Sequence, residues 1–289
     1  MQTYLDKIDN AIDLINHAEK IVIGIGAGMS AAGGLCYTDP ELAQKWYPEY
    51  FSLGKKSIIE IMSEFWPTSL NENNATKFWG FWAKHIFHIR YEPDALQPYL
   101  DLFNIVKGKD YFICTTNVDS QTEKAGFDAF RTSAMQGNYC FFQCSTPCTQ
   151  EIFHNEIIIE QMIHNMITPF EIKKTDIPVC PHCGALLVPN LRCDNRFVES
   201  PNLANLSKYE EYVTNCRNKT SIFLELGVGY NTPGIIRYPF EKMVHSMPKS
   251  HLIRVNNMNT EIHLPLGEKN ISVQVDLMKF MADLAIHYC

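Results

Sequence analysis

A short aliphatic run that ends in closely spaced glycines is the feature that most constrains how this chain can fold. Residues 21–35 read Ile-Val-Ile-Gly-Ile-Gly-Ala-Gly-Met-Ser-Ala-Ala-Gly-Gly-Leu. Such a run predicts a buried strand that turns directly into a helix, and the N-terminus of a helix is a common site for a phosphate group. Glycines suit this turn because their backbone bends tightly and approaches a ligand where any Cβ would be in the way.

The glycine turn also fits a known nucleotide-binding pattern. Residues 26–31, Gly-Ala-Gly-Met-Ser-Ala, match the G-x-G-x-x-G/A form of a dinucleotide turn. Glycine-rich turns also serve purely structural ends, so the match needs support from other residues. The acidic residue expected about 20 positions later, at the end of a second strand, is not evident. Glu41 and Glu49 lie in a polar, proline-bearing stretch instead. The turn therefore suggests a nucleotide but not the ordinary dehydrogenase arrangement.

Composition narrows the class of protein. The chain has 289 residues, enough for one large domain or a large domain with a small module. Its net charge of −7 argues against nucleic acid as the main partner, because phosphate binding needs a basic face. We find no signal-peptide pattern and no run of about 18 apolar residues, so we expect a cytoplasmic protein without a membrane partner. Ten cysteines then point to a metal or reduced thiols rather than disulfides.

Apolar periodicity predicts helices that alternate with short strands. We expect helices over 4–19 and 93–102 and strands over 20–25, 111–114, 221–226 and 251–255. The aromatic-rich stretch between them, about 38–95, is expected to be helical in pieces. Its residues Phe78, Trp79, Phe81, Trp82, His85 and Phe87 could line a pocket, but core packing is the favoured interpretation. Alternating strands and helices imply a parallel α/β sheet whose ligand crevice lies beyond the C-terminal ends of the strands.

Polar or flexible segments follow four of the predicted strands. These segments are the glycine turn with Ser30, Thr115–Asp119, Gly227–Pro233 and Arg254–Asn257. An amide and a carboxylate such as Asn117 and Asp119 can orient a ribose hydroxyl, a water molecule or a carboxamide. The alternative is that one of these two residues merely caps the next helix.

Four cysteines have a spacing that is typical of a metal site. Three residues separate Cys144 from Cys148, two separate Cys180 from Cys183, and 31 residues lie between the pairs. Two thiolate pairs joined by a loop predict a closed, structural zinc site. The alternative is a set of reduced cysteines in a small core. Cys140 and Cys193 lie near enough in the sequence to replace a ligand.

Together these motifs resemble the sirtuin family over nearly the whole chain. The sirtuin motif G-A-G-x-S corresponds to residues 26–30, T-Q-N-[IV]-D to 115–119 and G-[TS]-S to 227–229, and the cysteine pairs and Asn256 also match in order and approximate spacing. The resemblance implies an α/β fold with a Rossmann-like parallel sheet flanked by helices, a helical insertion and a small zinc-binding module. We place the NAD-binding Rossmann-like domain at 1–136 and 200–289, with the insertion at about 38–95, and the zinc module at 137–199.

The resemblance also implies ligands and roles for individual residues. NAD would be consumed as a co-substrate and would contact Gly26, Ala27, Gly28, Ser30, Thr116, Asn117, Val118, Asp119, Gly227, Val228, Gly229 and Asn256. A structural zinc ion would be held by Cys144, Cys148, Cys180 and Cys183. In the family, the residue matching Asn117 contacts the ribose and positions water. The residue matching Asp119, with the backbone of Val118, holds the carboxamide.

One departure from the family changes the expected chemistry. Family deacylases place a histidine eight residues before the first zinc cysteine, and this chain has Gln136 at that position. The histidine acts as general base on a ribose hydroxyl, whereas a glutamine amide has no useful basicity near neutral pH. Loss of a general base typically lowers the rate about 10²–10⁴-fold. Deacylation should therefore be slow or absent.

Other departures from the family motifs point the same way. The family loop G-I-P-D-F-R is replaced by Gly34–Asp39 without its arginine and phenylalanine, Thr116 replaces a glutamine, and Gly229 replaces a serine. The substrate strand here contains Arg192 and Arg196. These side chains could orient a phosphate or an acidic acceptor, although arginines on a loop are more often solvated.

This combination is similar to the class M sirtuins of microbes. Those relatives have glutamine at the histidine position, are usually found with a macrodomain protein, and ADP-ribosylate a lipoylated glycine-cleavage H-like carrier protein. We therefore predict an NAD-dependent protein mono-ADP-ribosyltransferase that acts on such a carrier, with Asn117, Gln136 and Arg192 at the reacting centre and a functional link to a macrodomain ADP-ribosyl hydrolase. One alternative is an NAD-dependent protein-lysine deacylase or delipoylase. Another is a catalytically silent NAD or ADP-ribose sensor.

Overall fold

A six-stranded parallel sheet forms the centre of the larger lobe. The computed structural model describes residues 2–288, and the side chains of all of these but 202 and 204. The strand order is β3-β2-β1-β7-β8-β9, and every neighbouring pair is parallel. The bounds are β1 Lys20–Ile25, β2 Tyr111–Thr115, β3 Thr132–Ala134, β7 Ser221–Leu226, β8 Ser250–Asn256 and β9 Asn270–Gln274. The order reverses between β1 and β7, and parallel sheets bind their ligands at such a switch point.

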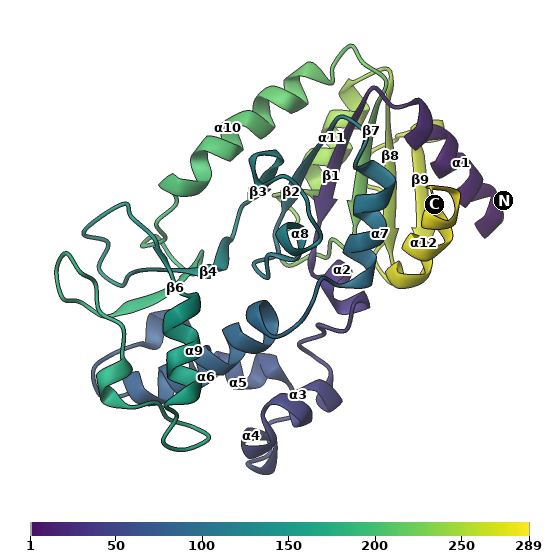
Figure 1. Cartoon of the computed structure of the whole chain (residues 1–289). Coiled ribbons are helices and arrows are strands. Elements are labelled where there is room, and N and C mark those ends of the chain that lie inside the picture. The colour runs from purple at the N-terminus through teal and green to yellow at the C-terminus, as the bar shows by residue number, and fades with distance from the viewer. Residues whose placement is uncertain (1, 289) are drawn as a thin grey trace.

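Helices cover both faces of this sheet (Figure 1). One layer contains α1 Tyr4–His17, α7 Gln97–Val106 and α12 Leu277–Ala285, and the other contains α10 Ser200–Asn215 and α11 Arg237–Ser246. Alternate residues of β1 enter the two cores, because Ile21 and Ile23 pack with the first layer and Val22 packs with the second. The predicted parallel α/β sheet is therefore confirmed.

The predicted bounds hold for most of the central elements. β1 and β7 begin and end where the sequence indicates, and β2 and β8 are longer by one or two residues. The helix expected over 93–102 instead begins at Gln97, with Pro98 in its first turn. A proline fits there because the first turn does not need its missing N–H group. The edge strands β3 and β9 were not expected.

A smaller lobe combines the helical insertion with a three-stranded antiparallel sheet (Figure 1). Its strands are β4 Gly137–Cys144, β5 Phe153–His154 and β6 Leu187–Leu191, and its helices are α3 Pro40–Trp46, α4 Pro48–Ser52, α5 Ile58–Glu64, α6 Ala75–Ile86 and α9 Glu156–His164. Both parts share one hydrophobic cluster. Two further short helices follow strands of the parallel sheet, α2 Ala27–Ala32 after β1 and α8 Gln121–Lys124 after β2. Short helical turns occupy Pro67–Ser69, Phe87–Tyr91, Ala129–Arg131, Lys174–Asp176, Gly267–Lys269 and Ile286–Tyr288. The domain boundaries proposed from the sequence remain a prediction.

The aromatic residues of α6 pack in the core of the smaller lobe. Phe78, Trp79, Phe81, Trp82 and His85 are fully buried, which confirms the packing interpretation for them. His85 lies between two hydroxyl groups, because Nδ1 is 3.1 Å from the Tyr47 oxygen and Nε2 is 3.1 Å from the Tyr139 oxygen. Burial, together with nearby His88, lowers the pKa of His85 to about 3. The ring is therefore neutral at physiological pH.

Within residues 2–288, no helix has both the length and the apolar character needed to cross a membrane.

The buried ring predicts a pH-dependent stability. The unfolded chain protonates His85 near its ordinary pKa of 6.5, whereas the folded chain does so only near 3. The neutral His85 ring therefore makes its full contribution to the free energy of unfolding above pH 6.5, and this contribution is lost as the pH falls from there toward 3. We expect wild type to lose about 2 kcal/mol more than His85→Phe between pH 7 and pH 5. Urea unfolding at both pH values measures this, and equal losses in the two proteins would contradict it.

Candidate functional site

The C-terminal ends of four neighbouring strands meet at a cavity of about 510 Å³, here called the main cavity. Its lining includes Gly26, Ala27 and Gly28 after β1, Thr116, Asn117 and Val118 after β2, Gly227, Val228 and Gly229 after β7, and Asn256 at the end of β8. A side cavity of about 400 Å³ shares Ala27, Gly28 and Thr116–Val118 with it and adds Ser30 and Asp119. Every residue that the sequence suggested for nucleotide contact thus lines one of these two cavities.

Two glycine turns lie in backbone contact at the strand-order switch point. A Cβ on Gly26 would lie 2.6 Å from the Gly227 carbonyl oxygen, and one on Gly28 would lie 2.8 Å from the Gly227 Cα. Gly227 itself has φ +65°, and its own Cβ would lie 2.5 Å from the Met29 nitrogen. The Gly28 N–H donates to the Gly227 carbonyl at 3.0 Å. Side chains are therefore excluded where the two turns meet, whereas Gly229 faces open space.

Asn117 joins the end of β2 to this glycine turn. Its Nδ2 lies 3.0 Å from the Gly26 carbonyl oxygen, 3.0 Å from Ser30 Oγ and 2.9 Å from the Tyr99 hydroxyl. Ser30 Oγ in turn donates to Asp119 Oδ2 at 2.6 Å. The network fixes the Asn117 side chain at the boundary of the two cavities. Its side chain does not cap α8, so the capping alternative fails for Asn117.

Asp119 combines a structural contact with a buried position in the side cavity. Its Oδ1 accepts the Gln121 N–H at 3.1 Å at the start of α8, although the N-cap residue of this helix is Ser120 and not Asp119. Burial raises the pKa of Asp119, while hydrogen bonds from Ser30 and Gln121 favour the carboxylate. The following residue, Ser120, has φ +59°, the left-handed conformation that non-glycine residues rarely adopt. The backbone therefore turns sharply directly after the carboxylate.

Gln136 and Arg192 bring the smaller lobe to the main cavity. Both residues line it with Asn117. The Arg192 N–H donates to the Gln136 carbonyl at 2.9 Å, and its Nε donates to the Met135 carbonyl at 3.1 Å. The guanidinium also pairs with Glu199 and lies 4.7 Å above the ring of Phe197.

The walls of the two cavities contain few groups that could take up a proton. Among their described lining residues, Asp119 is the single carboxylate, and neither histidine nor lysine occurs. The described lining of these cavities therefore offers no imidazole or amine that could replace the histidine for which Gln136 stands.

Two predictions about individual residues need correction or refinement. Arg254 does not follow a strand at the site but lies buried within β8. It is held there by Glu225, 2.8 Å from its Nε, and by Glu241, 2.7 Å from its Nη1. Arg196 does not line the main cavity and instead pairs with Asp194 at 2.7 Å.

The main cavity also has lining residues that the sequence analysis did not single out as site residues. These are Met62, Trp66, Tyr139, Leu191, Cys193, Asn231, Thr232, Asn257 and Asn259. Asn231 and Thr232 lie in the flagged turn Gly227–Pro233, and Asn257 directly follows Asn256, so these positions had a signal. Met62 and Trp66 come from α5 and the segment after it, where no motif indicates a site.

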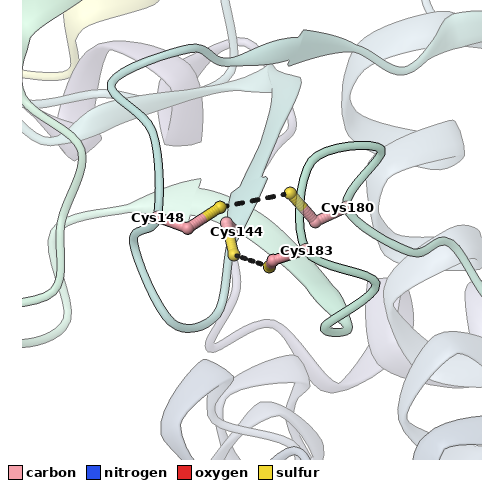
Figure 2. Close-up of side chains that lie close together, drawn as sticks. All are labelled: Cys144, Cys148, Cys180 and Cys183. Carbon is pink, nitrogen blue, oxygen red and sulfur yellow. Dashed lines mark hydrogen bonds between the residues drawn. The ribbon is translucent and has the colours of Figure 1, made fainter.

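The four predicted cysteines converge at one point of the smaller lobe (Figure 2). The sulfur atoms of Cys144 and Cys183 are 3.6 Å apart, as are those of Cys148 and Cys180, and all four lie within 4.8 Å of one another. Zinc–sulfur bonds of about 2.3 Å in a regular tetrahedron give sulfur–sulfur distances of about 3.8 Å. The cluster therefore fits a structural zinc ion, held by thiolates alone.

The two additional cysteines do not join this cluster. Cys140 accepts a hydrogen bond from Arg90 Nε at 2.7 Å, and Cys193 lines the main cavity. The suggested exchange of a zinc ligand for Cys140 or Cys193 is thus not seen.

Removal of one thiolate tests the metal site. We expect wild type to contain about one zinc ion per chain and Cys180→Ser to lose it, because three thiolates no longer close the tetrahedron. Cys36→Ser, outside the cluster, is the control and should retain the ion. Elemental analysis of the purified proteins measures the ratio. Equal zinc contents in wild type and Cys180→Ser would contradict the assignment.

Comparisons with known proteins agree with this geometry. No protein-family model matches the chain. A protein ADP-ribosyltransferase of Staphylococcus aureus (strain Mu50) is 29% identical over 269 residues, which cover 91% of this chain and 82% of that protein. A probable bifunctional ADP-ribose hydrolase/ADP-ribosyltransferase of Fusarium oxysporum f. sp. cubense is 27% identical over 272 residues, 90% of this chain. The matched part is 44% of the fungal protein, so this chain corresponds to less than half of it.

Solved structures of Sir2 proteins share the fold. An ADP-ribose complex of a Sir2 homologue variant has a TM-score of 0.61 at 16% identity and covers 97% of this chain and 96% of its own. An NAD complex of a Sir2 homologue has a TM-score of 0.60 at 17% identity, with 97% and 93% covered. The fold is therefore that of the sirtuins. The chain thus has a sirtuin-like fold, and over about nine-tenths of its length its sequence is similar to proteins named as ADP-ribosyltransferases.

Proposed function

We propose that this protein is an NAD-dependent mono-ADP-ribosyltransferase that modifies another protein. The observation that carries the proposal is Gln136, which lies in the main cavity with Asn117 and Arg192. The main cavity thus keeps the amide that the resemblance places beside the ribose, but its described lining has no histidine, lysine or carboxylate that could serve as the deacylase base. The names of the bacterial and fungal relatives support the same reaction class.

The site has the parts that NAD binding requires. The glycines of the paired turns present backbone and no side chains to the main cavity, where a pyrophosphate could lie against them. Asn231, Asn257 and Asn259 line the same cavity and offer neutral amides to a nucleoside. The amide of Asn256 is instead hydrogen-bonded to the backbone of Val228, Met258 and Asn259. In the side cavity, Asp119 with the backbone of Val118 would hold the carboxamide, and Asn117 would contact the ribose. Bound NAD supplies ADP-ribose when its nicotinamide–ribose bond breaks.

The proton balance favours transfer over deacylation. Deacylation requires that a ribose hydroxyl lose its proton after the acyl oxygen attacks, and a glutamine amide cannot take that proton. The remaining carboxylate, Asp119, is already engaged by Ser30 and the Gln121 N–H. Cleavage of the nicotinamide–ribose bond releases neutral nicotinamide, and an acceptor group that attacks the ribose as an anion, such as a carboxylate, has no proton to give up. This transfer therefore needs no base from the pocket, only preorganised polar groups and little water. The buried network of Asn117, Ser30 and Tyr99 provides such preorganisation.

We further propose that the acceptor is a lipoylated glycine-cleavage H-like carrier protein in the cytoplasm. This step follows from the similarity to class M sirtuins. A functional link to a macrodomain ADP-ribosyl hydrolase has support from the fungal relative, whose name joins a hydrolase and a transferase in one protein. Arg192 at the cavity and Arg196 on the same loop would face the acceptor.

The direct test incubates the protein with NAD and lipoylated carrier. We expect mass spectrometry to show one ADP-ribose on the carrier, and Asn117→Ala to lower nicotinamide release by about 10²-fold because a preorganised amide is lost. Asn104→Ala, an exposed amide of α7, is the matched control and should behave like wild type. Robust deacylation of acyl-lysine peptides without an adduct would favour the deacylase alternative. Absence of any nicotinamide release would favour the silent sensor.

A single substitution tests the role of Gln136. Gln136→His supplies a base with a pKa near 6.5, so we expect deacylation of an acyl-lysine peptide to rise at least about tenfold and to increase through pH 6–7. Initial rates across this pH range measure the effect. The mechanism proposed here would be wrong if wild type already deacylated rapidly and the substitution changed nothing.

A further inference from the structure

The loop that contains Arg192 is held by two buried amides that lie outside both cavities. Residues 192–199 connect β6 to α10. Gln143 on β4 and Asn190 on β6, here called the amide clamp, lie beneath this loop and line neither the main nor the side cavity. Gln143 is 3% exposed and Asn190 is fully buried.

Four hydrogen bonds define the amide clamp. Gln143 Nε2 donates to the Arg196 carbonyl at 2.8 Å, and Gln143 Oε1 accepts the Val198 N–H at 3.0 Å. Asn190 Nδ2 donates to Gln143 Oε1 at 2.8 Å and to the Val198 carbonyl at 3.1 Å. Both backbone groups of Val198 are therefore fixed by the clamp.

Burial makes these amides costly unless they hold something in place. Val188, which lies opposite Gln143 in the β4–β6 pair, belongs to the hydrophobic cluster of the smaller lobe. A buried amide without partners costs free energy, and Asn190 Oδ1 has no hydrogen-bond partner. An apolar pair would avoid that cost but would leave the backbone of Val198 unpaired. The two buried amides therefore serve to bind the backbone of the 192–199 loop, and the pairing of β4 with β6 does not need them.

Val198 links the clamp to Arg192. Its two chain neighbours are the residues that hold the guanidinium: Phe197 lies beneath it at 4.7 Å, and Glu199 pairs with it. Arg192 Nε also donates to the Met135 carbonyl beside Gln136. Fixing the backbone of Val198 therefore fixes the ring and the carboxylate that aim Arg192 at the main cavity.

We propose that Gln143 and Asn190 are positioning residues for ADP-ribosyl transfer, acting through Val198 on the orientation of Arg192. This inference rests on the proposed function. Neither amide lines the cavities formed by the glycine turns and strand ends of the larger lobe, where NAD would bind. Loss of the clamp should therefore impair transfer to the acceptor and leave NAD binding intact.

The experiment compares Gln143→Met with the matched control Gln161→Met, the same change on the exposed face of α9. Methionine keeps the length and the apolar stem but cannot replace the amide hydrogen bonds. We expect faster amide hydrogen exchange in the peptide that contains 192–199, and transfer to the lipoylated carrier lowered about tenfold to a hundredfold. The Kd for NAD, the zinc content and exchange in β1, β2 and β7 should stay at wild-type values. Asn190→Ala is the second variant, should Gln143→Met fold poorly.

A double-mutant cycle separates positioning from a general loss of packing. In an Arg192→Ala background, Gln143→Met should lower transfer by less than about twofold, because the residue it acts through is gone. Additive losses, or unchanged exchange in 192–199, would overturn the inference. If wild type forms no adduct on the carrier at all, the proposed function fails instead. Unchanged exchange would still refute the clamp in that case.

Discussion

Backbone contact between the turn after β1 and the turn after β7 sets the geometry of the whole site. Gly26 and Gly28 lie against Gly227 so closely that a Cβ at any of the three would overlap the other turn. Because β1 and β7 are neighbours at the switch point, this contact closes one side of the main cavity and exposes peptide groups to it. Asn117 then ties the end of β2 to the same turn through the Gly26 carbonyl. Two strand ends are thus fixed by backbone contact, and the third is fixed by the side-chain amide of Asn117.

Local patterns explain which parts of this arrangement could be predicted from the sequence. β1 and β7 are apolar runs bounded by glycine, and the cysteine pairs are close in the chain, so their spacing alone indicates a strand or a metal site. Arg254 shows the opposite case. A charged residue inside a buried strand is tolerated because Glu225 and Glu241, distant in the sequence, pair with it. No local pattern contains that information, and the prediction for Arg254 was wrong for this reason.

The residues of the candidate site fall into the same two groups, those found from local motifs and those placed by tertiary contacts. The residues after β1, β2 and β7 were found from motifs, and the resemblance to sirtuins singled out Gln136. Met62 and Trp66 reach the main cavity from a helical insertion whose packing depends on the core of the smaller lobe. The amide clamp was invisible for a related reason, since Gln143 and Asn190 become meaningful only when β4 and β6 are paired. Tertiary contacts therefore decide what the sequence motifs leave open.

The two lobes contribute different kinds of groups to the main cavity, and this difference is relevant to which reaction takes place. The two glycine turns present backbone groups, which would bind the same dinucleotide whatever reaction follows. They therefore cannot by themselves distinguish deacylation from ADP-ribosyl transfer. Under the proposed function, that choice would depend on side chains that the smaller lobe and the connection to it bring to the main cavity, chiefly Gln136 and Arg192. Both are held by backbone contacts at the start of β4 and the end of β6, since the Arg192 N–H donates to the Gln136 carbonyl. Under the proposed function, a change at these two positions would therefore alter the chemistry of this fold while the glycine turns stay the same.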